Sequence, residues 1–250
     1  MNKKRTVYCV VPARTGSSRL PGKVLKPLAG KPSLLRQIDR LLQAKTIDKI
    51  IVATTTEKRD DAIVDLVKDY HPKVSAARGS EIDVTDRFYQ ALLEYKPDVV
   101  LRITGDCPLI DPEVVDLVVN EYLRFNGDYV ANTLKERTYP RGLDTEAFSF
   151  EILEKLWKDL KTEEEREHVT LFIRRNTDLF KCKNIKNPVD YSFHRWTLDE
   201  PGDYTLLNTI FEELQDKNPQ FRMKDVIELF EKRPELIKIN QDVEQKNPHY

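Results

Sequence analysis

Three cations and two glycines lie together in a loop that follows the first apolar run of the sequence. The run covers residues 7–11, and residues 12–23 then read Pro-Ala-Arg-Thr-Gly-Ser-Ser-Arg-Leu-Pro-Gly-Lys. Gly16 and Gly22 allow the backbone to approach a ligand closely and to expose N–H groups to an anion. The cations of this loop are Arg14, Arg19 and Lys23. Because open α/β sheets bind ligands beyond the carboxyl ends of their strands, the loop predicts a triphosphate site.

Two common phosphate-binding motifs do not fit this loop. A Walker A loop has four residues between its first glycine and a Gly-Lys-Ser/Thr triplet, whereas five residues separate Gly16 from Gly22 and Lys23 is followed by Val24. The G-x-G-x-x-G pattern of dinucleotide-binding folds is also absent. These mismatches argue against a P-loop ATPase and a Rossmann dehydrogenase. The alternative without a ligand is a solvated, basic surface loop.

Two aspartates follow predicted strands elsewhere in the chain. Asp106 comes after the apolar run 99–103, and Asp199 follows the short run 195–198. Carboxylates beside a triphosphate typically hold Mg²⁺, which takes one or two carboxylates together with phosphate oxygens. Without a ligand, Asp106 would be a turn residue and Asp199 a helix N-cap. Cys107 is interpreted as a small, buried and inert thiol.

The elements that must position these residues alternate along the chain. Apolar runs predict strands at 7–11, 50–53, 99–103 and 128–131, and helical spacing predicts helices at 34–44, 60–70 and 113–125. This alternation indicates an α/β fold with a mostly parallel sheet and helices on both faces. From about residue 134 the alternation stops. There we expect a charged helix at 155–175, a strand at 195–198, a helix at 201–214 and a polar surface tail after Arg233.

Length and composition narrow the class of protein. The 250 residues suit one domain, in which we expect residues 134–194 to form an insert or cap. The 41 basic and 42 acidic residues leave a net charge of −1, which argues against a nucleic-acid binder. The sequence contains no run of eighteen apolar residues, which argues against a membrane-spanning helix. Three cysteines without a CxxC pair favour a reducing, cytoplasmic setting.

Three fragments together carry a family resemblance. Val11-Pro-Ala-Arg14, Arg19-Leu-Pro-Gly-Lys23 and Leu28-Ala-Gly-Lys-Pro32 resemble the cytidylyltransferases that make CMP-activated sugars, such as the CMP-Kdo and CMP-sialic acid synthetases. The spore-coat polysaccharide biosynthesis proteins are the most similar branch, and the resemblance extends over about residues 7–214. It implies a three-layer, Rossmann-like nucleotidyltransferase fold that uses CTP and Mg²⁺. It further implies CMP transfer to an acidic sugar or phosphorylated small molecule, pyrophosphate release, surface polysaccharide synthesis and a homodimer formed through the insert.

The resemblance also implies roles for individual residues. The catalytic cations would be Arg14, Arg19 and Lys23. The nucleotide would contact Pro12, Ala13, Arg14, Gly16, Lys23, Arg78, Ser80 and Asp106. The metal ligands would be Asp106 and Asp199, with Asp203 structural. The second substrate would contact Arg141, Asp144, Glu146 and His168, although residues 165–168 are alternatively a solvated helix face.

Two other functions remain open from the sequence. One is a nucleotide-sugar-dependent glycosyltransferase of related fold, although the Asp-x-Asp motif is missing at Asp106-Cys107-Pro108. The other is a nucleotide-sensing subunit without catalysis. The sequence does not identify the acceptor, and it does not distinguish cytidine from uridine.

Overall fold

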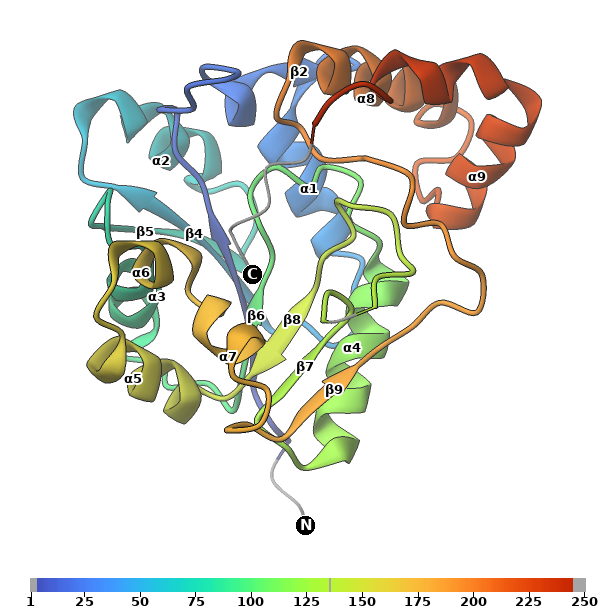
Figure 1. Ribbon diagram of the computed structural model, residues 1–250. Coiled ribbons are helices and arrows are strands. Elements are labelled where there is room, and N and C mark those ends of the chain that lie inside the picture. The colour runs from blue at the N-terminus through green and yellow to red at the C-terminus, as the bar shows by residue number, and fades with distance from the viewer. Residues whose placement is uncertain (1–3, 135, 245–250) are drawn as a thin grey trace.

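A mixed sheet forms the centre of the molecule, which is described by a computed structural model for residues 4–134 and 136–244. Its strands within these residues are β1 (Val7–Pro12), β4 (Lys49–Thr55), β5 (Val74–Gly79), β6 (Val99–Arg102), β7 (Tyr129–Ala131), β8 (Glu146–Phe148) and β9 (Cys182–Asn184). Their order is β5-β4-β1-β6-β8-β7-β9 (Figure 1). Only β8 runs antiparallel to its neighbours among these strands. A separate hairpin pairs β2 (Pro27–Leu28) with β3 (Lys31–Pro32).

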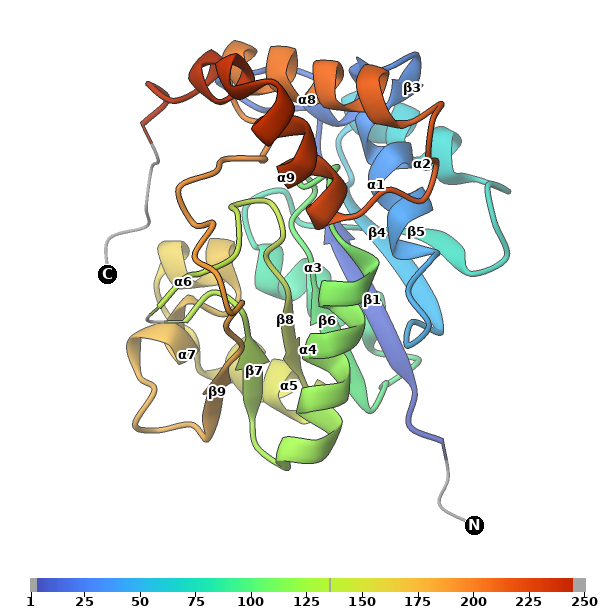
Figure 2. The same ribbon diagram turned by 90° about the vertical axis from the view of Figure 1, so that its right-hand side faces the viewer.

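Helices cover both faces of the sheet. They are α1 (Ser33–Leu41), α2 (Asp61–Val67), α3 (Val84–Leu92), α4 (Pro112–Phe125), α5 (Phe150–Asp159), α6 (Glu163–His168), α7 (Leu171–Arg175), α8 (Pro201–Leu214) and α9 (Met223–Lys232). Short 3₁₀ turns are η1 (Lys23–Leu25), η2 (Lys58–Asp60) and η3 (Pro234–Ile239). One apolar cluster joins the sheet to α1, α4 and α8, and a second joins it to α3, α5 and α7 (Figure 1). In Figure 2, α8 and α9 lie together above the upper end of the sheet. The predicted three-layer α/β fold is confirmed.

The apolar runs of β1 and β6 explain how the two loops of interest meet. Both strands are buried on both faces, so Cys9 packs into one apolar cluster and Val10 into the other. The two strands are parallel neighbours, with Cys9 opposite Leu101 and Val10 opposite Arg102. Parallel strands end at the same edge of a sheet. The loop after Pro12 and the loop after Arg102 therefore emerge side by side.

Most of the predicted elements are confirmed. The strands predicted at 7–11, 50–53, 99–103 and 128–131 correspond to β1, β4, β6 and β7, and the helices predicted at 34–44, 113–125 and 201–214 correspond to α1, α4 and α8. The helix expected at 60–70 is shorter. It starts after a 3₁₀ turn, in which the buried Asp60 accepts hydrogen bonds from Thr15 and Thr55. It ends at Val67, because the backbone of Lys68 leaves the helical conformation.

Three expectations for the second half are wrong. The helix expected at 155–175 is divided into α5, α6 and α7. Leu160 adopts an extended conformation, and the hydroxyl of Thr162 accepts a hydrogen bond from the Glu165 N–H at 3.3 Å, which starts a new helix. Val169, with φ 54°, separates α6 from α7. The breaks therefore occur at buried apolar residues, Leu160 and Val169, and at the Thr162 cap, and the run of charges does not continue the helix through them.

The other two wrong expectations concern the strand at 195–198 and the tail. Arg195 forms only an isolated bridge with Arg141, because its side chain is bound by buried carboxylates. The tail does not lie wholly on the surface. Leu236 is buried, and the buried Asn240 side chain donates hydrogen bonds to the Arg195 carbonyl and the Asp203 carboxylate, both at 2.9 Å.

Residues 134–194 are partly integrated into the central sheet. They contribute β8, which lies between β6 and β7, and β9 at the sheet edge. They also contribute α5, α6 and α7, and residue 135 lies outside the described part. None of the helices in the described part of the chain has the length and apolar character that crossing a membrane requires.

Candidate active site

A cleft of about 550 Å³ opens where β1 and β6 end. It brings together nine of the residues named from the sequence, namely Pro12, Ala13, Arg14, Gly16, Arg19, Lys23, Asp106, His168 and Asp199. The other five, Arg78, Ser80, Arg141, Asp144 and Glu146, do not line it. The basic loop and the two distant aspartates therefore share one cavity.

The two loops at the base of the cleft are in close contact. A Cβ atom built on Gly105 would lie 2.2 Å from the carbonyl oxygen of Pro12, so only glycine permits this approach. The basic loop is further tied to Asp60, whose carboxylate accepts hydrogen bonds from the Thr15 N–H at 2.7 Å and the Thr15 hydroxyl at 2.6 Å. These contacts fix the loop against the sheet before any ligand binds.

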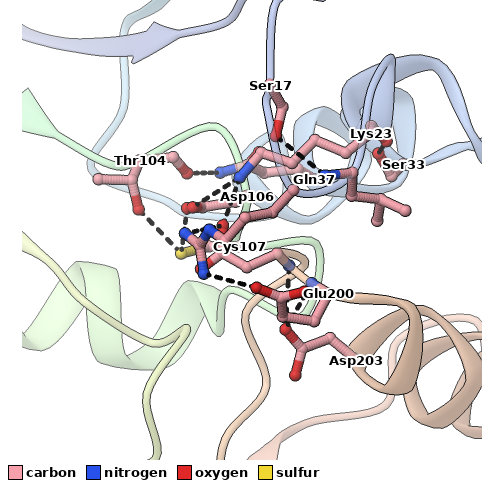
Figure 3. A network of polar contacts seen from close by, with 12 residues as sticks. Ser17, Lys23, Ser33, Gln37, Thr104, Asp106, Cys107, Glu200 and Asp203 are labelled. Carbon is pink, nitrogen blue, oxygen red and sulfur yellow. Dashed lines mark hydrogen bonds and ion pairs between the residues drawn. The ribbon is translucent and has the colours of Figure 1, made fainter. Parts of the chain in front are cut away.

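Lys23 joins the two aspartates, and Figure 3 shows its side chain beside Asp106. Its Nζ atom lies 3.0 Å from Oδ2 of Asp106 and 2.6 Å from Oδ1 of Asp199. Burial alone would lower the pKa of Lys23, but the charges of the two carboxylates outweigh it and raise that pKa. Burial alone would also raise the pKa of Asp106, yet the Lys23 charge and a hydrogen bond from Thr104 hold it well below its usual range. Lys23 and Asp106 are therefore both ionised at neutral pH.

A second group of contacts fixes Asp199 from behind. Nη2 of Arg195 lies 3.1 Å from Oδ2 of Asp199, while Nε and Nη2 of Arg195 bond the two oxygens of Asp203 at 2.9 and 3.0 Å. Asp203 is fully buried and also accepts the backbone N–H groups of Asp199 and Glu200 (Figure 3), which is a structural role. Arg19 closes the group at 3.2 Å from Oδ1 of Asp199.

The donor set fits a divalent cation. Two carboxylate oxygens, from Asp106 and Asp199, converge on a single cationic atom, the Lys23 ammonium nitrogen. Mg²⁺ is bound in this way by one or two carboxylates, with phosphate and water oxygens completing its coordination. The described residues contain no group of three or more His, Cys, Asp or Glu side chains suited to hold a metal alone. The carboxylates of Asp106 and Asp199 therefore suit an ion that is bound to a phosphate group at the same time.

Cys107 lies beside this group without contributing a charge. Its Sγ atom is 3.0 Å from the hydroxyl of Thr104, and the residue is 1% exposed (Figure 3). Burial raises the pKa of its thiol well above the usual value, so Cys107 remains a neutral thiol.

The cleft contains further basic residues to which the sequence assigned no definite role. Arg87 of α3 and Arg102 of β6 both line it, beside Arg14 and His168. Burial lowers the pKa of Arg87 to about 10, which still leaves it charged. Arg102 had a signal in the sequence, because it is the one charge in the run 99–103. From the sequence, Arg87 could either reach phosphate or pair with a carboxylate, and nothing in its local pattern decides between the two.

Two residues expected to contact the nucleotide are occupied elsewhere. The Arg78 guanidinium donates hydrogen bonds to the carbonyl oxygens of Thr55 and Glu57 at 2.9 and 3.0 Å, and Nη2 lies 2.6 Å from a carboxylate oxygen of Asp61. The Ser80 hydroxyl accepts a hydrogen bond from the Asp83 N–H at 3.0 Å. Arg78 thus stabilises the β4–β5 edge, and Ser80 stabilises the turn before α3.

Three residues expected to contact the second substrate also lie outside the cleft. Arg141 lines a separate cavity of about 170 Å³. Asp144 accepts two hydrogen bonds from Arg137, at 2.5 and 2.9 Å. Glu146 is 3% exposed and lies behind Arg102. Of this set, only His168 reaches the cleft.

Comparisons with known proteins agree with this geometry. The chain matches the cytidylyltransferase family over residues 8–248. An uncharacterised protein of Methanocaldococcus jannaschii is 40% identical over 240 residues, which cover 95% of this chain and 96% of that protein. The spore coat polysaccharide biosynthesis protein SpsF of Bacillus subtilis is 29% identical over 239 residues, covering 92% of this chain and 95% of SpsF.

A solved structure extends the similarity to three dimensions. A cytidylyltransferase from Leptospira borgpetersenii superposes with a TM-score of 0.88 at 34% identity, covering 98% of this chain and all of that one (100%). The family match, rather than the fold, argues against the alternative of a glycosyltransferase. From the family match and these relatives, we conclude that the chain belongs to the cytidylyltransferase family and is a nucleotidyltransferase.

Proposed function

We propose that this protein transfers CMP from CTP to an acidic sugar or a phosphorylated small molecule and releases pyrophosphate. The observation that carries this proposal is the meeting of the basic loop 12–23 with Asp106 and Asp199 in one cleft. A loop with three cations suits a free triphosphate, and the two carboxylates suit the cation that accompanies it.

The reaction requires little covalent chemistry from the protein. An oxygen of the acceptor attacks the α-phosphorus of CTP, the bond to the β-phosphate oxygen breaks, and pyrophosphate leaves. Arg14, Arg19 and Lys23 would hold the β- and γ-phosphates and offset the charge that develops on the leaving group. The fixed loop holds the triphosphate in line with the acceptor, which supplies the positional part of the rate enhancement.

Mg²⁺ belongs to this proposal as the cation held by Asp106 and Asp199. When bound, it would polarise the α-phosphate and lower the pKa of an attacking hydroxyl. The contribution of the chain is to hold both carboxylates so that they point at one position. Lys23 neutralises them, and Arg195 fixes the orientation of Asp199.

The name of SpsF supports a role in surface polysaccharide biosynthesis, which we extend to this chain as part of the proposal. We further propose a cytoplasmic homodimer formed through residues 134–194. Sedimentation of the full chain, with substitutions confined to that segment, tests the dimer.

A pyrophosphate-release screen tests the reaction. CTP, UTP, ATP and GTP are each mixed with 2-keto-3-deoxy acid sugars, sugar phosphates and phosphonates, with magnesium chloride or with EDTA. We expect release only with CTP, an anionic acceptor and magnesium, and a CMP adduct by mass spectrometry. Lys23→Met should lower turnover by orders of magnitude, whereas Lys45→Met, at an exposed lysine outside the cleft, should not. Full activity of Lys23→Met, or equal activity in EDTA, contradicts the assigned roles.

A further inference from the structure

Arg102 is a buried charge in a strand that is otherwise apolar. It ends β6, where it is opposite Val10 of β1 and Glu146 of β8. Its side chain is only 11% exposed. A guanidinium held away from water is unfavourable unless other groups compensate its charge and fill its donors. The contacts of Arg102 therefore show which of its donors are used within the protein.

Glu146 compensates the charge but is itself enclosed. One of its oxygens lies 2.5 Å from Nη1 of Arg102, and the other accepts hydrogen bonds from the hydroxyls of Tyr129, at 2.7 Å, and Thr170. Burial alone would raise the pKa of Glu146, but the charges of Arg102 and Arg174 lower it, so the carboxylate stays ionised. Both oxygens are used within the protein. Glu146 thus holds the Arg102 guanidinium in one orientation and does not reach the cleft.

Part of the Arg102 guanidinium remains available. Its Nε atom is buried and has no hydrogen-bond partner among the described residues. A guanidinium carries five N–H donors in a planar fork that matches carboxylate and phosphate oxygens. Arg102 lines the cleft beside His168. Burial and the nearby charge of Arg102 lower the pKa of His168, which leaves a neutral imidazole able to donate one hydrogen bond.

Arg102 and His168 belong to other elements than Lys23 and Asp199. Side chains two positions apart in a strand share a face, and Val100 packs in the cluster with α3, α5 and α7. The Arg102 side chain is therefore expected on the same face as Val100. Lys23 and Asp199 instead belong to the start of η1 and the segment before α8. The cleft therefore has a basic end, formed by Arg87, Arg102 and His168 next to Arg14, in addition to the group around Lys23.

We propose that Arg102 determines specificity for the acceptor by binding its anionic group, a carboxylate or a phosphate, beside His168, and that Glu146 is a positioning residue for Arg102. This proposal rests on the proposed function, because it assigns the second substrate to the basic end of the cleft. It gives Glu146 an indirect role in place of the substrate contact expected from the sequence.

Nuclear magnetic resonance on the ¹⁵N-labelled full chain tests the proposal. Sodium pyruvate, inorganic phosphate and glucose are titrated separately while the Arg102 Nε–Hε signal and the His168 imidazole signals are followed. We expect saturable shifts with at least one anion and none with glucose. A response to pyruvate alone identifies a carboxylate acceptor, and a response to phosphate alone identifies a phosphorylated one. The amide signals of Gly16 and Gly22 report separately on phosphate in the triphosphate loop.

Variants separate recognition from structure. Arg102→Lys keeps the charge but not the fork, and it should weaken the anion response at His168 by about tenfold, in line with the loss of one charged hydrogen bond. Glu146→Gln should weaken it severalfold with a folded spectrum. The double variant Arg102→Gln with Glu146→Gln removes both charges together and should abolish it. Arg124→Lys, at an exposed arginine that also pairs with a glutamate, is the matched control and should bind as wild type.

The outcomes are decisive in both directions. No anion response in the wild type, an equal response to glucose, or an undiminished response in folded Arg102 variants overturns the proposal. Because these titrations need no turnover, an intact anion response without pyrophosphate release would contradict the proposed function alone. Pyrophosphate release with unchanged acceptor dependence in Arg102→Lys would contradict only the role of Arg102.

Discussion

Replacing Lys23 by methionine separates its electrostatic role from its catalytic one. The ammonium lies between Asp106 and Asp199, and the three side chains are 15%, 22% and 10% exposed. Breaking a fully buried ion pair costs about 3–5 kcal/mol. Here Asp199 keeps Arg19 and Arg195, so we expect a loss of about 2 kcal/mol in the free energy of unfolding at neutral pH. For a chain of this size that corresponds to a melting temperature lower by about 4–8 °C.

The pH dependence of this loss has a defined sign. Lys23 holds the pKa of Asp106 below the value of about 3.9 found in an unfolded chain. Such a carboxyl contributes stability above its unfolded pKa, and the contribution is lost as the pH falls through the folded pKa. In Lys23→Met this lowering of the pKa disappears. The difference between wild type and variant should therefore be full at neutral pH and shrink once the pH falls below about 4.

Urea unfolding of both proteins, with and without magnesium chloride, measures the effect. Magnesium should restore stability to Lys23→Met more than to the wild type, because the cation replaces the missing ammonium between the carboxylates. Lys45→Met is the control and should match the wild type throughout. Unchanged stability of Lys23→Met at neutral pH, or a deficit that neither acid nor magnesium alters, would refute the electrostatic reasoning.

Three further predictions follow from the site. Gly105→Ala should lower the free energy of unfolding by about 1–3 kcal/mol and reduce pyrophosphate release, because its Cβ would collide with the Pro12 carbonyl; wild-type values in both assays would contradict this. Asp203→Ala should cost about 3–5 kcal/mol in urea unfolding, since it leaves the buried Arg195 without its main partner, and a loss under 1 kcal/mol would be inconsistent. Burial lowers the pKa of His194 to about 4, so only the unfolded state gains a proton as the pH falls from about 6.5. The wild type should lose about 3 kcal/mol more than His194→Phe between about pH 6.5 and 4, and parallel pH profiles would count against a neutral, buried imidazole.

Local signals explain which elements the sequence could predict. Helix α8 begins at Pro201, a residue favoured in the first helical turn, and its predicted bounds are confirmed. Helix α4 follows Asp111, whose carboxylate accepts the Glu113 N–H. The strands β8 and β9 include charged or polar residues, Glu146 in β8 and Lys183 and Asn184 in β9, so neither forms the apolar run that revealed β7. Their place in the sheet depends on tertiary pairing, which no local pattern carries.

The residues of the site also differ in whether the sequence could locate them. Lys23 and Asp106 could be located because each follows a strand of the parallel sheet, and such strand ends meet at one edge. Arg78 also ends a strand, but neighbouring backbone carbonyls bind its guanidinium. Glu146 resembled a substrate contact, whereas sheet register places it behind Arg102. Which way a charged side chain points is decided by its neighbours in space, and the chain order does not reveal them.

The bond from Asn240 to Asp203 has a consequence for biosynthesis. The carboxylate that orients Arg195, and through it Asp199, is completed by a residue near position 240, while the triphosphate loop is translated within the first 23 residues. During translation the contacts that orient Asp199 therefore remain incomplete until most of the polypeptide has left the ribosome. Nascent chains arrested before Asn240 should bind nucleotide more weakly than those arrested after it has emerged, so maturation of the pocket is a late event in synthesis.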